Sequence, residues 1–252
     1  MCNYRMLVSY DGAPFRGFAR QPGLQTVQGG IEGALKRILG EEIRTSGAGR
    51  TDAGVHALGQ VMSFRTGAAV PDPVGFQQSM NALCRPAIAV LELGEAPEGF
   101  DARHSALSRT YEYAILTREV HDPFSRHTTW HRPGRLEAEA MRKGADALVG
   151  EHDFSSFGRV EPGQSAVRRV ESVEVEAAGD LVVIRITANS FLQQMVRSIV
   201  GTLARVGEGR RHPDQMGAVL DARDRSAAGP VAPPQGLFLV AVSYPEELFG
   251  VR

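Results

Sequence analysis

Gly47-Ala48-Gly49-Arg50-Thr51-Asp52-Ala53-Gly54-Val55-His56 is the stretch around which the rest of the chain is arranged. It holds three glycines, one strong cation and a single carboxylate, Asp52. Glycine allows backbone conformations and close approaches that other residues avoid. By composition alone, an Asp after a Thr in such a loop is most often a turn former or a cap. The alternative is that Asp52 is a nucleophile.

The segments on both sides of this loop predict a β-α-β-β-α-β unit. Thr26 is a suitable N-cap for the first helix, Gly40 ends it, and Pro73 stands in the first turn of the second helix, where its missing N–H costs little. Apolar residues recur at helical spacing in the helices and alternate in the strands. Strands are predicted at residues 4–10, 43–46, 60–65 and 88–93, and helices at 27–39 and 73–83.

The second half of the chain repeats this order of elements. A hairpin turns at Ala178-Gly179-Asp180, and a strong apolar stripe marks one long helix after it. Strands are predicted at residues 110–117, 170–176, 181–187 and 237–242, and helices at 136–148, 192–203 and 213–220.

Two β-α-β-β-α-β units predict an α+β fold of two ferredoxin-like halves. We place one domain at residues 1–100, which carries Asp52, and the other at 101–252. The pattern loosens near 94–108, where glycine and proline are frequent. We expect a large, mostly antiparallel sheet with helices on one face and a central cleft on the other.

The composition is that of an ordinary globular protein, with 42% hydrophobic and 23% charged residues among 252. No apolar run is long enough to span a membrane, and the N-terminus has no signal-like apolar segment, so we expect the cytoplasm. The net charge of −1 does not by itself indicate a nucleic-acid partner.

Two residues of the second half are candidates to assist Asp52. Arg197 lies near the start of the most apolar helix, where a buried arginine needs an anionic partner. Asp52 is one candidate among 29 acids. Tyr111 lies on a predicted strand and, taken alone, is more often a packing residue.

Motifs for a metal or an organic cofactor are missing. His121, His127 and His131 are close in sequence but lack a HExxH or Cys-assisted pattern, and no Gly-Lys-Ser/Thr follows the glycines. We therefore expect no cofactor and no metal, with any reaction running on side chains alone.

Further motifs, spread through the chain, identify a family. They are Gly49–His56, Tyr10-Asp11-Gly12, Phe100–Ala106, Arg109–Tyr113, His152–Phe157, Phe191 with Met195–Gly201, and Gly236–Val240. In this order they resemble the TruA family of tRNA pseudouridine synthases, over residues 10 to about 245. The first motif is highly specific, whereas each of the others would be weak alone.

The resemblance implies a reaction and roles. Uridine at positions 38, 39 and 40 of the tRNA anticodon stem-loop would be isomerised to pseudouridine, by a homodimer whose cleft binds RNA. Asp52 would be the nucleophile, attacking uracil C6 or ribose C1′. Tyr111 would pack against the target base and help move the C5 proton, and Arg197 would pair with Asp52.

Arginines would contact the RNA. Arg50, next to the nucleophile, would fill the place of the unstacked base. For phosphate contacts we expect Arg16, Arg20, Arg103, Arg168 and Arg169. Two departures from the family pattern, Phe18-Ala19 and Gln193-Gln194, concern RNA affinity rather than the reaction. Two other functions stay open: an RNA-binding module without activity, and an aspartate-dependent nucleosidase.

Overall fold

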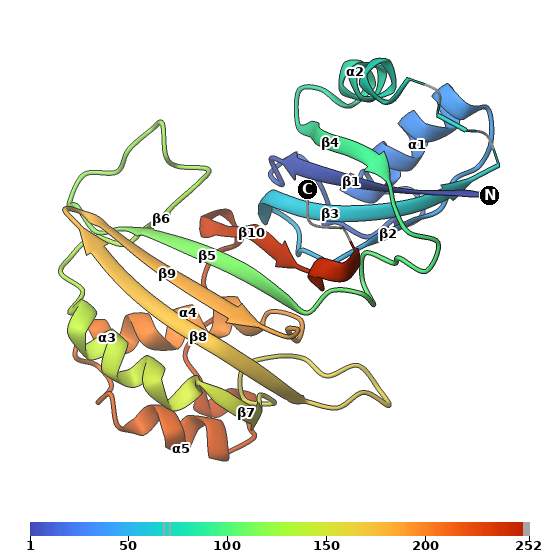
Figure 1. Cartoon of the computed structure of the whole chain (residues 1–252). Coiled ribbons are helices and arrows are strands. Elements are labelled where there is room, and N and C mark those ends of the chain that lie inside the picture. The colour runs from blue at the N-terminus through green and yellow to red at the C-terminus, as the bar shows by residue number, and fades with distance from the viewer. Residues whose placement is uncertain (68, 71, 249–252) are drawn as a thin grey trace. The chain divides into compact units, whose positions relative to one another are not determined.

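The computed structural model describes residues 1–67, 69–70 and 72–248 (Figure 1). These form ten strands and five α-helices, and the predicted α+β class with a large, mostly antiparallel sheet is confirmed. The chain divides into two compact units. Unit 1 is Met1–Arg109 with Leu239–Arg252, and unit 2 is Thr110–Phe238. Each unit is described by itself below.

Unit 1 is a sheet with two helices on one face (Figure 1). Its strands pair antiparallel in the order β4-β1-β3, and β2 pairs with β3. The last five residues of β10 also belong to this unit. The elements are β1 (Cys2–Tyr10), α1 (Val27–Leu39), β2 (Thr45–Gly47), β3 (His56–Thr66), α2 (Pro73–Cys84), β4 (Ile88–Glu95) and β10 (Leu237–Ser243).

The two helices begin and end where the sequence predicts. The Thr26 side chain accepts a hydrogen bond from Gly29 N at the start of α1, and Gly40 ends that helix in the left-handed region at φ 74°. A side chain that satisfies a first-turn N–H and a glycine after the last turn are the usual helix boundaries. Asp72 caps α2 in the same way, ahead of Pro73.

β3 differs from the prediction, because it is buried on both faces rather than on one. Gln60, Val61, Met62 and Ser63 are all buried. The reason is that β3 is flanked by β1 and β2, and that Val61 packs into a second small core on the other face. That core contains Ala48, Phe100 and Ala102, with Leu7, Val242 and Tyr244 against it.

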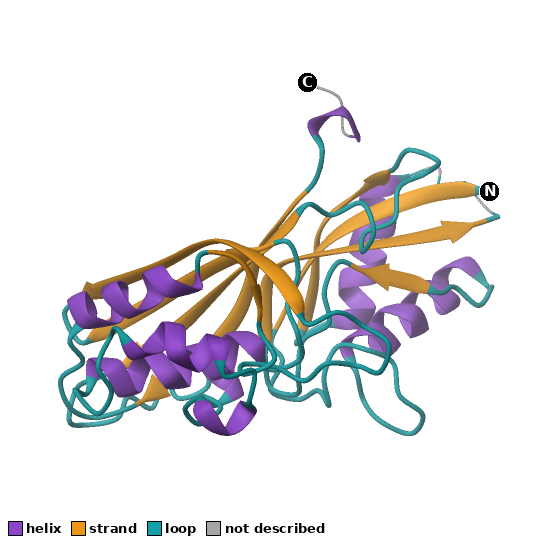
Figure 2. Cartoon of the chain, turned by 90° about the horizontal axis from the view of Figure 1, so that it is seen from below, coloured by secondary structure: helices purple, strands orange, loops and turns teal. Residues whose placement is uncertain are grey.

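Unit 2 has strands in the order β5-β9-β8-β7, with its helices on one face (Figure 2). Two short strands, β6 and β7, were not predicted, and α4 begins three residues later than expected. The elements are β5 (Ser108–Leu116), β6 (Trp130–His131), α3 (Ala138–Ala145), β7 (Gly150–Asp153), β8 (Val167–Ala178), β9 (Leu181–Ala188), α4 (Met195–Gly207) and α5 (Gln215–Asp221).

The helices are all short. The longest described ones, α1 and α4, have 13 residues each. No helix in the described ranges is both long and apolar enough to cross a bilayer.

Candidate active site

Asp52 lies in the loop that joins β2 to β3. Its side chain is partly exposed, between the buried Thr51 and the exposed Ala53. Val55 N donates to Asp52 O at 3.1 Å, and Gly54 takes φ 78°, which closes a tight turn after the acid. A carboxylate reachable by solvent on a tight turn has the access that a nucleophile needs.

The residue before Asp52 is held by two contacts from the N-terminal segment. Tyr10 Oη and Thr51 Oγ1 are 2.9 Å apart, and Phe18 N donates to Thr51 O at 3.0 Å. Burial raises the pKa of Tyr10 to about 12, although hydrogen bonds to Thr51 and Gln60 oppose this shift. The Tyr10 hydroxyl therefore stays protonated at neutral pH.

The start of the loop is held by two other buried side chains. Gln60 Nε2 donates to Gly49 O at 2.7 Å, and Gly49 N donates back to Gln60 Oε1 at 3.4 Å. Arg109 binds Ala48 O through Nε at 3.0 Å and through one terminal nitrogen at 2.8 Å. The segment ahead of Asp52 is thus held at Ala48, Gly49 and Thr51 by residues of other elements.

The end of the loop packs tightly against Gly12. A Cβ on Gly12 would lie 2.0 Å from Val55 O, so the two backbones touch here. His56 Nδ1 lies 3.1 Å from Gly12 N and 3.1 Å from Asp11 Oδ1, so the buried imidazole holds the Asp11-Gly12 turn against the end of the loop.

One departure from the family pattern lies next to this loop. Phe18 is buried, its ring centroid is 6.3 Å from that of Tyr10, and its ring leaves no room for a Cβ on Gly47. Phe18 is therefore a packing residue beneath the loop.

Tyr111 and Arg197 lie in unit 2, on β5 and in the first turn of α4. The Tyr111 side chain is 6% exposed, and its ring meets that of Phe191 edge-on, with centroids 5.1 Å apart. Arg197 Nε donates to Ala232 O at 2.7 Å, and Ala232 N donates to Arg197 O at 3.0 Å. One residue thus fixes both the backbone and the side chain of Arg197.

The charge of Arg197 also acts on a buried neighbour within unit 2. Burial raises the pKa of Tyr113 far above its ordinary value, and the positive charge of Arg197 opposes that rise. Tyr113 Oη donates to Pro233 O at 2.8 Å, beside the Ala232 contact of Arg197. The segment at 232–233 therefore braces the start of α4 against β5.

The arginines expected to contact RNA differ in exposure. Five have exposed side chains, namely Arg16, Arg20, Arg50, Arg103 and Arg169. Arg20 contacts the buried Glu32 at 3.1 Å. Arg168 is half-buried and donates to the carbonyls of Ser165 and Val167, and burial lowers its pKa. Arg168 is thus the least available of the six for a phosphate.

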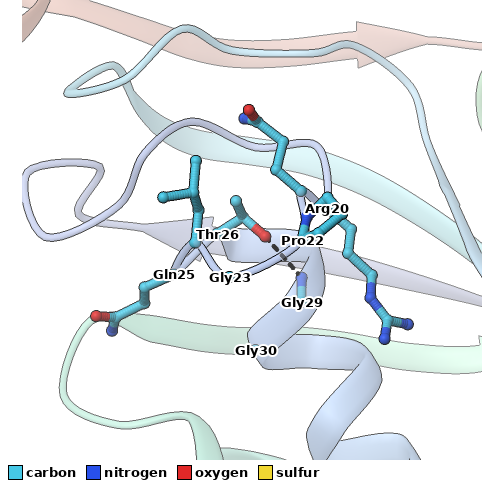
Figure 3. Close-up of a pocket in the computed structure, with 9 residues that line it drawn as sticks. Arg20, Pro22, Gly23, Gln25, Thr26, Gly29 and Gly30 are labelled. Carbon is cyan, nitrogen blue, oxygen red and sulfur yellow. Dashed lines mark hydrogen bonds between the residues drawn. The ribbon is translucent and has the colours of Figure 1, made fainter.

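A shallow cavity of about 480 Å³ lies at the start of α1 (Figure 3). It is lined by Arg20–Thr26, Gly29 and Gly30, and the Thr26–Gly29 hydrogen bond lies among these residues. The cavity does not include Asp52. Within the described ranges, no three His, Cys, Asp or Glu side chains are grouped so that they could hold a metal ion.

The anchors of the loop were missed by sequence reasoning. Tyr10 and Arg109 stood in motifs that carry the resemblance, and Gln60 stood in a predicted strand, but none was assigned a role. A signal was available, because these polar side chains lie in, or directly next to, segments that the pattern predicts to be buried. Buried polar groups need hydrogen-bond partners, so each of them could have been expected to hold another part of the chain.

Comparison with known proteins identifies the family. The family model described as tRNA pseudouridine synthase matches residues 6–105 and 145–245. The tRNA pseudouridine synthase A of Rhizobium leguminosarum bv. trifolii is 43% identical over 250 residues, 98% of this chain and 93% of that protein. The protein of the same name from Xanthobacter autotrophicus is 43% identical over 97% of this chain and 100% of its own length. A third, from Rhodopseudomonas palustris strain BisB5, is 44% identical over the same shares. The chain belongs to the tRNA pseudouridine synthase family.

Proposed function

We propose that this chain isomerises uridine to pseudouridine in tRNA, at positions 38, 39 and 40 of the anticodon stem-loop. The observation that carries the proposal is identity of about 43% over nearly the whole chain with proteins named tRNA pseudouridine synthase A. The complete Gly49–His56 motif, with its carboxylate on a firmly held loop, supports the same reaction.

Asp52 is the nucleophile in this proposal. The N1–C1′ bond breaks, the uracil turns, a C5–C1′ bond forms, C5 loses a proton and N1 gains one. Atoms and electrons balance without a co-reactant. The reaction therefore needs only a carboxylate and a group that transfers one proton from C5. Whether Asp52 adds to uracil C6 or attacks ribose C1′ is left open by these residues.

Tyr111 and Arg197 have supporting roles in the proposal. Tyr111 packs against the target base and assists the transfer of the C5 proton. Arg197 pairs with Asp52 and keeps the carboxylate ionised, because a nearby positive charge favours the charged form. The fixed position of Arg197 on Ala232 supports this assignment, since catalytic groups need a firm second layer of contacts.

Binding and organisation complete the proposal. The target base must leave the stack, which costs a few kcal/mol, and Arg50 takes its place. Arg103, Arg16, Arg20, Arg168 and Arg169 contact phosphates. The enzyme works as a homodimer in the cytoplasm, with one half at residues 1–100 supplying Asp52 and the other at 101–252 supplying the partner groups around an RNA cleft.

The test uses unmodified tRNA transcript and the full-length protein, with pseudouridine mapped by chemical labelling. We expect product at 38–40, and a loss of at least about a thousandfold in rate for Asp52→Asn, as for removal of other nucleophiles. Asp180→Asn, at an exposed hairpin, is the matched control and should keep the wild-type rate. Arg197→Ala should lose activity in the same assay.

Four other outcomes would each contradict part of the proposal. Binding of tRNA without product would indicate an RNA-binding module. Release of free uracil, seen by chromatography, would indicate a nucleosidase. Normal product formation by Asp52→Asn would remove the nucleophile, and a fully active Arg197→Ala would remove the ion pair.

A further inference from the structure

The backbone around Asp52 is held by side chains whose polar groups do little for packing. Tyr10, Gln60 and Arg109 are 5%, 0% and 8% exposed. Burying such polar groups is costly unless they are hydrogen-bonded. Here their hydrogen bonds reach the nucleophile loop at Ala48, Gly49 and Thr51.

Arg109 joins the loop to a second turn. Besides Ala48 O, it donates to Arg103 O at 2.6 Å and to Ala106 O at 3.2 Å. These acceptors are neutral carbonyls on two separate segments. A planar guanidinium with several N–H groups in a fixed fork suits this task, because it sets the relative position of two backbones. Arg109 therefore ties the turn at Arg103 to the loop of Asp52 within unit 1.

Tyr10 shows most clearly that a buried polar group holds this loop. A phenylalanine would fill the space of its ring, and only the hydroxyl reaches Thr51 Oγ1. Another buried tyrosine on the same strand, Tyr4, uses its hydroxyl differently and accepts from Val70 N at 2.9 Å. β1 thus carries two buried hydroxyls, one bound next to the nucleophile and one bound elsewhere.

We propose that Tyr10, Gln60 and Arg109 are positioning residues of the reaction, which fix the Asp52 carboxylate by holding the loop at the carbonyls of Ala48 and Gly49 and at the Thr51 hydroxyl. The inference rests on the proposed function. Its physical reason is that a displacement of the reacting group by about 1 Å can cost on the order of a hundredfold in rate, even when substrate binding is unchanged.

The experiment is a double-mutant cycle on the hydroxyl pair. Tyr10→Phe, Thr51→Val and the double variant are compared in single-turnover pseudouridine formation at saturating enzyme. The affinity for tRNA and the thermal midpoint are measured on the same samples. Tyr4→Phe is the matched control, because it also removes one buried hydroxyl from β1 and leaves the loop alone.

We expect each single variant to lose roughly tenfold in the single-turnover rate, with tRNA affinity within about twofold of wild type. The double variant should be no slower than either single variant, because the two hydroxyls act as a unit. Each single variant leaves one buried hydroxyl without its partner, which destabilises the loop, and the double variant removes both hydroxyls. Tyr4→Phe should lower the thermal midpoint and keep the wild-type rate.

Two results would overturn the inference: wild-type rates for both Tyr10→Phe and Thr51→Val, or an equal loss of rate in Tyr4→Phe. If Tyr10→Phe fails to fold, Thr51→Val tests the same bond from its other end. Failure of the proposed function is distinguishable, because the wild-type protein would then form no pseudouridine.

Discussion

Two loops of this molecule are stabilised in opposite ways. The loop 47–56 of unit 1 is held by side chains 11 to 61 residues away in sequence, from β1, β3 and the start of β5. The loop 118–129 of unit 2 is held mainly by its own residues. The first loop is fixed in place by distant residues, whereas the second keeps its shape through contacts among its own residues.

The contacts of the loop 118–129 are local. Arg118 Nε donates to Val120 O at 2.8 Å, Phe124 N donates to Asp122 Oδ1 at 3.1 Å, and Thr129 Oγ1 donates to Ser125 O at 3.0 Å. The Phe124 side chain is 94% exposed. Local contacts of this kind give a loop a shape without tying it to the core.

This difference predicts which substitutions change the structure around Asp52. A change in the distant anchors of the loop 47–56 alters the backbone next to Asp52, although the changed residue is far away in sequence. A change in the loop 118–129 stays within that loop. Three variants test this contrast, beginning with the largest expected effect.

Gly12→Ala should damage the loop 47–56 most. Its new Cβ would lie 2.0 Å from Val55 O, so the backbone must move. We expect unfolding free energy to fall by about 1–3 kcal/mol, as for other overpacked sites, together with a lower rate of pseudouridine formation. Chemical denaturation and the tRNA assay measure the two effects.

The control for this variant is Gly99→Ala, in the same unit, where a Cβ meets no atom within 4 Å. It should match the wild type in both measurements. Equal stability of the two alanine variants would show that the contact between Gly12 and Val55 relaxes freely, and the loop 47–56 would then be no more constrained than the loop 118–129.

Salt dependence distinguishes the arginines of the two loops. Arg50 and Arg126 are both exposed. If Arg50 takes the place of the target base, its charge displaces counterions from the neighbouring phosphates. Arg50→Ser should then reduce the slope of log K against log salt by about 0.7–0.9, the value for one neutralised phosphate. Arg126→Ser should leave the slope unchanged. Binding titrations at several salt concentrations measure both, and identical slopes would contradict the assignment of Arg50.

Phe124→Ser should have the smallest effect. The Phe124 side chain is almost fully exposed, and the hydrogen bond from Phe124 to Asp122 uses the backbone N–H, which serine keeps. We therefore expect a stability change within about 0.5 kcal/mol and a wild-type rate. A thermal scan and the tRNA assay check this. A large loss of activity would assign this loop a role in binding, and the contrast between the loops would fail.

Much of the fold follows from local sequence patterns. Thr26 caps α1 and Pro73 stands in the first turn of α2 as predicted, because these signals depend on residues within one turn. The short β6 and β7 were missed, since two and four residues carry too little alternation to be recognised. The burial of Val61 on β3 depends on contacts with distant residues such as Phe100 and Val242, which local alternation does not reveal.

The candidate site was predictable in a different way. Asp52 was selected because its neighbours form a specific motif, and Tyr111 and Arg197 were selected from the same resemblance, so the roles of all three stay predictions. The anchoring role of Tyr10, Gln60 and Arg109 was not assigned from the sequence. Polar side chains in segments predicted to be buried indicate that partners exist, but they do not tell which partners. Two of the partners here are the backbone carbonyls of Ala48 and Gly49, and carbonyls leave no pattern in the sequence.

The division of unit 1 between the two ends of the chain has a consequence for its biosynthesis. Tyr244 packs against Phe100, with ring centroids 5.2 Å apart, and donates to Ala102 O at 2.7 Å. These contacts must wait until all of unit 2 has been translated, which at about 5–20 residues per second takes on the order of ten seconds. During that time the small core around Val61 stays open on the ribosome. Until then, Ala48 of the loop 47–56 lacks part of the core against which it packs, so this side of the loop is open to chaperones and proteases.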